Sequence, residues 1–323
     1  MQGNLDGAMV DCDKAIETKP DYADAYAVRG KIKRSKTDLN GALTDYNEAI
    51  KLKPDDAQFY SMRGQIERDK GDLAGSLNDF NKAITIELNS NGDAYDDYSI
   101  RGTLKALKGD MDGALADYDK AIELKPSHAM TYALRGKVKV FKADWDGALV
   151  DYDKFIRYTP NEFDAINAYY ERGAVKKIKG DLDGAIADYS KVIELNPEYA
   201  GAYMSRAFVK AAKGDSAGAL ADCNDSIELK PYDAIFYTGR GQVKQTLGDL
   251  DGALTDLNKA VELKTNFALA YQTRGLVKQA KGDTNGAQAD LKIAIELNSK
   301  LRESVEAEGF FTNSLFRNGT NSN

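Results

Sequence analysis

Small, aromatic and charged positions recur along this chain in nearly the same order about nine times. The stretch GDMDGALADYDKAIELKP at residues 109–126 returns as GDLDGAIADYSKVIELNP at residues 180–197. The pattern of one such unit predicts two helices, over residues 129–142 and 145–158. Because the motif is present in every unit, it indicates repeated architecture rather than an active site.

Two dipeptide markers set the period of the repeat. Arg-Gly begins at Arg29 and recurs at steps of 34, 38, 34, 37, 34, 34 and 34 residues, with Arg206-Ala207 filling one position. A Gly-Ala or Gly-Ser marker follows the same steps and occurs once more at the front. The two longer steps place extra residues within 87–97 and 159–168, between units. These insertions are expected to lengthen loops or helix ends without breaking the core.

Polar residues mark where the predicted helices start and stop. An aspartate stands at the start of each second helix, where it can accept hydrogen bonds from free backbone N–H groups. Glycines are predicted to form the turn and a close helix contact, and prolines to stop the second helix. A calcium-binding loop is the alternative for these Asp-rich stretches, but the spaced ligands and closing glutamate of that motif are missing. The predicted caps are Asp38, Asp72, Asp110, Asp144, Asp181, Asp215, Asp249 and Asp283.

These residues and their spacing resemble the tetratricopeptide repeat (TPR), a 34-residue helix–turn–helix unit. The family's glycine matches the glycine of Arg-Gly, and its second aromatic matches Tyr46 and Phe80 among others. The resemblance covers residues 3 to about 299 and implies an all-α, right-handed superhelical solenoid of eight full repeats after a leading half-repeat. The family's early aromatic matches Tyr26, Tyr60, Tyr98, Tyr132, Tyr169, Tyr203, Tyr237 and Tyr271.

The resemblance also predicts how the chain is divided. Residues 1–20 are expected to be the second helix of a half-repeat, 21–299 the eight repeats, 300–312 a degenerate first helix or capping helix, and 313–323 a disordered polar tail. In the repeat register, Glu308 stands where the other units have arginine. The units are expected to stack, because one unit alone buries too little apolar surface to offset its ordering entropy.

Two positions depart from the family's pattern. An arginine replaces the leucine before the glycine, and a lysine usually replaces the tyrosine three residues after it. In an antiparallel hairpin these arginines lie level with an aspartate of the second helix, so a buried, bidentate Arg–Asp ladder is predicted. An anion-binding row of arginines is the alternative, weakened by the aspartates alongside. The ladder includes the pairs Arg29 and Asp45, Arg135 and Asp151, and Arg172 and Asp188.

Composition argues against several functional classes. The formal net charge of −7 is spread along the 323 residues, without the clustered Lys and Arg that bind nucleic acid or anionic membranes. No apolar run approaches the ~20 residues of a membrane helix, and the first residues lack a signal peptide. A single histidine, His128, and two cysteines disfavour an enzyme, a metal site or a cofactor. The compartment is left open, and an incomplete N-terminus is one explanation of the leading half-repeat.

The resemblance implies that a partner protein or peptide binds a concave face lined by the first helices. That face turns apolar in the middle of the chain, and clustered exposed apolar side chains favour a binding site. The alternative is that some of these side chains pack between neighbouring first helices. The candidate groove residues are Leu107, Val140, Phe141, Tyr170, Ile178, Met204 and Phe208.

The incomplete units at the two ends suggest a second hypothesis, a structural protein that binds copies of itself. The tail of one molecule would complete the opening half-repeat of the next and build a head-to-tail filament. Glycosylation sequons at Asn224 and Asn318 leave modification open. The candidate end-to-end contacts are Leu5, Met9, Cys12 and Ile16 on one side and Val305, Phe310 and Phe311 on the other.

Overall fold

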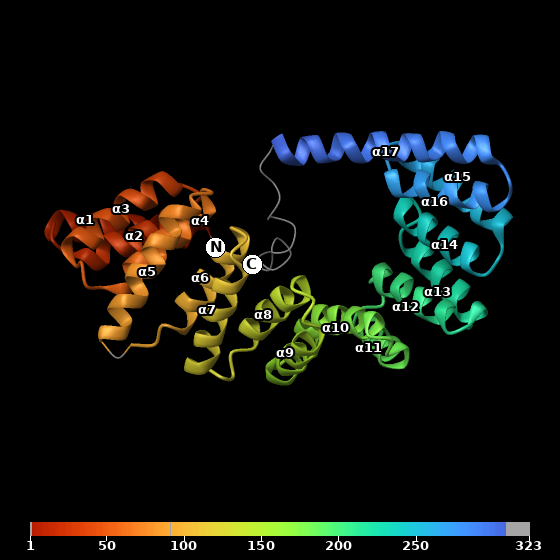
Figure 1. Cartoon of the computed structure of the whole chain (residues 1–323). Helices are drawn as coiled ribbons and strands as arrows, with labels where there is room; N and C mark the ends of the chain where they lie inside the picture. The colour runs from red at the N-terminus through yellow and green to blue at the C-terminus, as the bar shows by residue number, and fades with distance from the viewer. Residues whose placement is uncertain (1, 91, 308–323) are drawn as a thin grey trace. The chain divides into compact units, whose positions relative to one another are not determined.

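The computed structural model of the chain describes residues 2–90 and 92–307. Within these residues the fold is all-α, with seventeen α-helices, one short 3-10 helix and no strand (Figure 1). The helices pair in helix–turn–helix repeats, as the sequence predicts. By its internal contacts the chain divides between Val138 and Lys139 into a first and a second compact unit.

The helices of the described residues form two series. The first helices of the repeats have 13 residues each: α2 (Ala23–Ser35), α4 (Ala57–Asp69), α6 (Tyr95–Leu107), α8 (Ala129–Phe141), α10 (Ile166–Ile178), α12 (Ala200–Ala212), α14 (Ala234–Thr246) and α16 (Ala268–Ala280). The second helices are α1 (Gln2–Thr18), α3 (Leu39–Leu52), α5 (Leu73–Asn89), α7 (Met111–Leu124), α9 (Trp145–Tyr158), α11 (Leu182–Leu195), α13 (Ser216–Leu229), α15 (Leu250–Leu263) and α17 (Thr284–Ala307).

An aspartate caps the second helices, as the sequence predicts. The Asp110 carboxylate accepts a hydrogen bond from the backbone N–H of Gly113 at 2.9 Å. The same contact recurs at the start of α3, α5, α9, α11, α13, α15 and α17. The cap satisfies a backbone donor that the first turn of a helix leaves unpaired. The aspartates of the repeated motif are therefore structural.

One residue whose backbone has a positive φ, in the left-handed region, lies in the turn between the two helices of a repeat. Six glycines take this position with φ between 83° and 87°, including Gly71 and Gly109. Thr37 and Ala143 take it in two other repeats, with φ of 63° and 58°. Glycine is favoured there because it has no Cβ to clash with the following carbonyl.

A second glycine lets the helices of one repeat approach closely. A Cβ on Gly102 of α6 would lie 2.9 Å from the ring of Tyr118 on α7, and Tyr118 is fully buried. In the repeat of α12 and α13, Ala207 takes the glycine position and the smaller Cys223 takes the aromatic position. The glycine is thus required by the size of the side chain opposite.

Within each unit the helices pack in chain order. A first helix contacts the second helix before it and the second helix after it, as α2 contacts α1 and α3. In the second unit, first helices also contact one another, α10 with α12 and α14 with α16. This arrangement makes the first helices a common layer within the unit, which is the layer on which the candidate groove residues lie.

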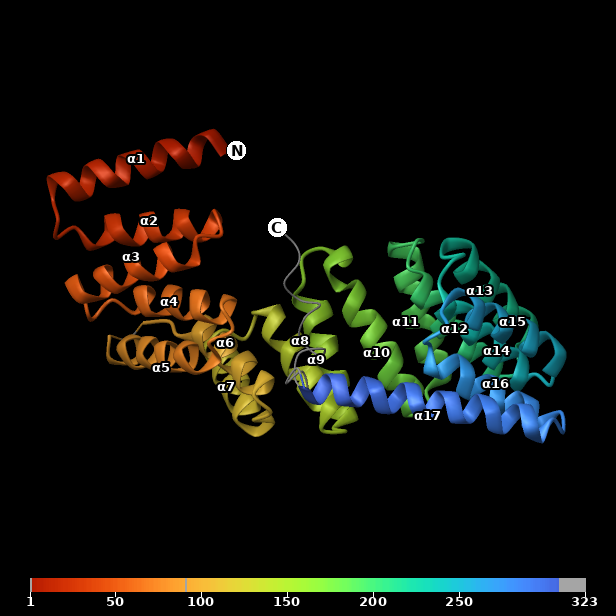
Figure 2. The same cartoon turned by 90° about the horizontal axis from the view of Figure 1, so that it is seen from above.

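The insertions and the last helix depart from the regular repeat. The first insertion extends α5 to 17 residues, and the second adds the 3-10 helix η1 (Glu162–Ala165). A degenerate first helix or capping helix was expected over 300–312, but α17 continues without a break to Ala307 and extends past α16 (Figure 2). No glycine or proline lies between 287 and 307 to end it. Residues 308–323 lie outside the described residues.

Candidate functional site

The arginines that precede the repeat glycine join three helices. Arg240 on α14 donates from Nε and Nη2 to the Asp256 carboxylate on α15, at 2.9 and 2.6 Å. Its Nη1 donates to Asn224 on α13, in the preceding repeat, at 2.7 Å. Asp256 is buried and is also bridged by Lys244 at 2.8 Å. Each rung therefore connects neighbouring repeats as well as the two helices of one repeat.

Two of the ladder pairs named from the sequence lie within single units. Arg29 donates to Asp45 at 3.1 and 2.7 Å, and Arg172 donates to Asp188 at 2.9 and 2.6 Å. The hydrogen bond with Asp45 raises the pKa of Arg29, because it favours the charged guanidinium. In both residues the remaining Nη1 donates to the preceding second helix, to Asp13 and to Asp153 respectively. The guanidinium donors are engaged, which does not favour an anion-binding row.

The third named pair spans the division of the chain. In the first unit, Arg135 donates from Nη1 to Asp119 at 2.6 Å. In the second unit, Asp151 is fully buried and is bridged by Lys139 at 2.8 Å. Each of the two residues thus has an ion-pair partner within its own unit.

Two of the candidate groove residues are open to solvent. Phe141 and Ile178, at the ends of α8 and α10, are 58% and 55% exposed. Val140 is half-buried. Exposed side chains of this size on one layer of helices are free to contact a partner.

The side chain of Tyr170, another candidate groove residue, packs between helices and does not point into an open groove. Its hydroxyl lies 2.9 Å from Ser205 Oγ on α12, and its ring lies 5.3 Å from the ring of Tyr199 and 5.5 Å from that of Tyr189. These distances are typical of packed aromatic side chains. Tyr170 therefore holds α10, α11 and α12 together, which is the packing alternative considered from the sequence.

Met204 belongs to the core, so its assignment to an open groove is wrong. It is 6% exposed, its Sδ lies 4.0 Å from Cys223 Sγ, and a Cβ on Gly239 would lie 2.5 Å from its Sδ. The absent side chain of Gly239 leaves the space that Met204 fills. Phe208, one turn further along α12, is half-buried and packs on the same cluster.

In the first unit, a hollow lies between α2 and α4. Leu107, the groove candidate of this unit, is half-buried at the end of α6 and does not line it. Besides the polar Lys31, this hollow has the apolar Val28 and Met62, each two residues before a repeat glycine, which were not among the groove residues predicted from the sequence. The hollow has a volume of about 300 Å³ and is lined by Asp24, Ala27, Val28, Lys31, Tyr46, Gln58, Phe59 and Met62.

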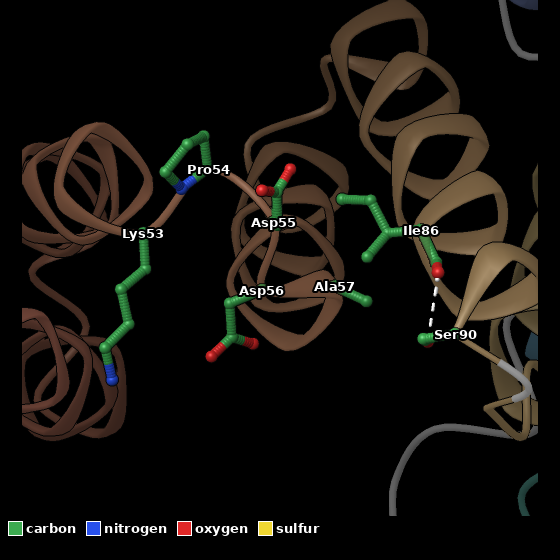
Figure 3. A pocket seen from close by; sticks show the side chains of 7 residues that line it. All are labelled: Lys53, Pro54, Asp55, Asp56, Ala57, Ile86 and Ser90. Atoms are coloured by element: carbon green, nitrogen blue, oxygen red, sulfur yellow. Dashed lines mark hydrogen bonds between the residues drawn. The ribbon is translucent and has the colours of Figure 1, made fainter.

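A larger opening of about 480 Å³ lies between the loop before α4 and the end of α5. Figure 3 shows Asp55 and Asp56 on the loop, across from Ile86 and Ser90. Most of its polar groups already have local partners: Asp56 accepts from Gln58 N at 3.1 Å, and Ser90 Oγ donates to the Ile86 carbonyl at 3.1 Å. The opening follows from the extension of α5 past the loop.

The described residues bring together few groups that suit catalysis. Among them, no three His, Cys, Asp or Glu side chains are placed to hold a metal ion. His128 Nδ1 lies 2.8 Å from Thr131 Oγ1, and burial lowers the pKa of His128, which favours the neutral ring. No helix of the described residues has the length and apolarity to cross a membrane.

The structure describes some of the candidate end-to-end contacts and one of the two glycosylation sequons. On α1, Cys12 is buried, whereas Leu5, Met9 and Ile16 are partly exposed. Asn224 is exposed and accepts the Arg240 hydrogen bond, while its sequon serine, Ser226, is fully buried. Of Val305 the structure describes only the backbone, and Phe310, Phe311 and Asn318 lie outside the described residues.

Comparison with known proteins shows the family. A model described as "TPR repeat" matches residues 30–66 and 173–214, and one described as "Tetratricopeptide repeat" matches 57–90, 98–128 and 234–267. No curated protein sequence matches the chain.

Solved structures are similar to this chain over most of its length. A tetratricopeptide repeat protein from Parabacteroides merdae has 23% identity, a TM-score of 0.65, and coverage of 77% of this chain and 96% of the other. The C-terminal part of a TPR protein from Cytophaga hutchinsonii has 18% identity, a TM-score of 0.62, and coverage of 76% and 97%. The family models cover more than half of the sequence, so the chain belongs to the tetratricopeptide repeat family.

Proposed function

We propose that the chain is a non-enzymatic scaffold that binds a partner protein or peptide on the faces of its first helices. The observation that carries the proposal is the hollow between α2 and α4. Val28 is 49% exposed there, and Ala27, Tyr46 and Met62 add apolar lining, while Asp24 and Lys31 stand among the lining residues. An apolar floor with a few polar groups is the usual character of a peptide or small-ligand site.

In the second unit, the same layer of helices exposes large aliphatic and aromatic side chains. Ile235 and Leu269 occupy equivalent positions on α14 and α16 and are 50% and 44% exposed, and Leu276 is 45% exposed. With Phe141 and Ile178, they give this layer more exposed apolar surface than a solvated helix face needs. The neighbouring Gln245 and Gln279 on the same two helices are amides, which hydrogen-bond to the backbone of an extended peptide without requiring charge.

The test is selection of peptides from a displayed random library on the full-length protein. Selected peptides are then measured against two double variants, Val28→Ser with Met62→Ser, and Phe141→Ser with Ile178→Ser. The proposal expects at least one of these variants to weaken binding by tenfold or more, about 1.4 kcal/mol.

Matched controls lie on the second helices. Val10 and Val150 are 50% and 55% exposed on α1 and α9, so Val10→Ser and Val150→Ser remove similar apolar surface from another face. Far-UV circular dichroism confirms that all variants keep their helicity. Peptides that bind every variant equally, or a library that yields no binder, would overturn the proposal.

Charge at the chain ends weighs against the alternative, a head-to-tail filament. In the repeat register, Glu308 takes the position of the ladder arginine and Asp11 takes the position of the ladder aspartate. Completing the opening half-repeat with the tail of another molecule would therefore oppose two carboxylates where the repeats oppose Arg and Asp. Sedimentation of the full-length protein over a concentration series separates the two functions, because a filament grows with concentration and a monomeric scaffold does not.

A further inference from the structure

One repeat of the ladder replaces its lysine with an acid. Among the described residues, the first helices other than α4 carry a lysine four residues after the ladder arginine, and its Nζ lies 2.8–2.9 Å from the buried aspartate. In α4 this position is Glu67. The lysines and their partners are Lys33 and Asp45, Lys105 and Asp117, Lys139 and Asp151, Lys176 and Asp188, Lys210 and Asp222, Lys244 and Asp256, and Lys278 and Asp290.

Glu67 lies where the ammonium group would be. A Cβ on Gly75 of α5 would be 2.9 Å from the Glu67 carboxyl carbon, so the carboxyl group sits against the start of α5. Its Oε2 is buried without a hydrogen-bond partner. A carboxyl oxygen that has lost its water and gained no donor favours the protonated form of the group.

The charges around Glu67 do not replace the missing lysine. Arg63 on α4 favours the ionised form, but both of its donors on this side are committed to Asp79, at 2.7 and 2.6 Å. Asp79 on α5 and Asp72, the capping residue before α5, favour the protonated form. Burial and then the charge of Asp79 raise the pKa of Glu67 to about 7.

We propose that protonation of Glu67 stabilises this repeat in place of the lysine, because it removes a negative charge beside Asp79. The α4–α5 hairpin should therefore open more often as the pH rises through neutrality. The reason is electrostatic: above that pH, Glu67 and Asp79 are both charged and share one arginine. The seven repeats that carry the lysine have a fixed positive charge there and should not respond. The hairpin of α4 and α5 is then a pH-sensitive element within an otherwise pH-insensitive ladder.

The sign and size of the effect follow from the pKa of Glu67. Its value in the folded chain, about 7, is higher than the ordinary 4.5, so the proton stabilises the fold at low pH. That stabilisation is full below the ordinary value and is lost as the pH rises through the folded value. Between about pH 6 and pH 8 the opening equilibrium of the hairpin should increase roughly tenfold more in the parent than in a variant without the carboxyl group.

The measurement is amide hydrogen exchange on the full chain, corrected for the intrinsic exchange rate, in peptides covering α4 and α5. Glu67→Gln keeps the shape and offers Asp79 an amide donor, and Glu67→Lys restores the pattern of the other repeats. Both should lose the extra tenfold change, and Glu67→Lys should protect the hairpin at the higher pH. Comparing parent and variant cancels the pH response of Glu87 and Asp97, whose pKa values burial raises to about 7 and about 6 in the same unit.

Glu48→Gln is the matched control, because Glu48 is partly exposed on the neighbouring α3 and pairs only with Lys51 among the ion pairs described. It should leave the pH response unchanged. An equal pH response in the parent and in both Glu67 variants would overturn the proposal. If Glu67→Gln does not fold, the comparison between the parent and Glu67→Lys tests the proposal by itself.

Discussion

Arg240 on α14 and Asn224 on α13 are joined by a hydrogen bond of 2.7 Å that crosses a repeat boundary. The same guanidinium binds the buried Asp256 within its own repeat. An arginine in this position therefore couples the folding of adjacent repeats, because either repeat alone leaves some of its donors without a protein acceptor. The equivalent contacts made by Arg29 and Arg172 extend this relationship to both units.

We expect Arg240→Ala to lower the free energy of unfolding by about 3 kcal/mol, because Asp256 stays buried with only Lys244 beside it. Asn224→Ala removes a single hydrogen bond and should cost about 1 kcal/mol. Urea unfolding followed by circular dichroism measures both. Arg157→Ala, at an exposed position on α9, is the control and should change stability by less than ~0.5 kcal/mol. An Arg240 variant as stable as this control would show that the rung contributes nothing.

Gly102→Ala should destabilise the first unit, although alanine is the better helix former by about 1 kcal/mol. The added Cβ lies 2.9 Å from the Tyr118 ring, and relieving that contact should cost about 1–3 kcal/mol. The natural pair Ala207 and Cys223 indicates how the clash is avoided. In a Tyr118→Cys background, Gly102→Ala should therefore be tolerated, and a double-mutant cycle in urea should give a favourable coupling of at least ~1 kcal/mol. Additive effects would mean that the glycine is not set by the ring.

Replacing the left-handed Ala143 with glycine should stabilise the protein. Ala143 has a φ of 58° in a position where six other repeats have glycine. Removing its Cβ relieves about 1–2 kcal/mol of strain, partly offset by the greater entropy of glycine in the unfolded chain, for a net gain of about 0.5–1 kcal/mol.

The converse variant, Gly71→Ala, should lose about 1 kcal/mol, because Gly71 has a φ of 86° and open space around the added Cβ. The pair separates backbone strain from side-chain packing. Thermal melts in which Ala143→Gly and Gly71→Ala shift the midpoint in the same direction would contradict this explanation.

Features that depend on residues close in the chain were predictable from the sequence. The caps at Asp110 and its equivalents, the turn glycines and the alternation of two helices follow from backbone donors and dihedral angles within one turn. The fold class follows from the period of the repeat. The same period predicts that each arginine lies beside an aspartate of the antiparallel second helix. A run without glycine or proline after residue 287 also favours the continuous α17, a signal that was outweighed by the expectation of a ninth first helix.

Only the tertiary structure decided which side chains of the first helices are free. Tyr170 and Phe141 lie on the same layer of helices, yet Tyr170 packs between α10, α11 and α12 while Phe141 is 58% exposed. Met204 is buried because Gly239, on the next first helix, leaves room for it. The hollow lined by Val28 and Met62 likewise depends on two helices 34 residues apart. The helical period determines the face on which a side chain lies, whereas its exposure depends on the size of side chains in the neighbouring repeat, which meet only when the repeats stack.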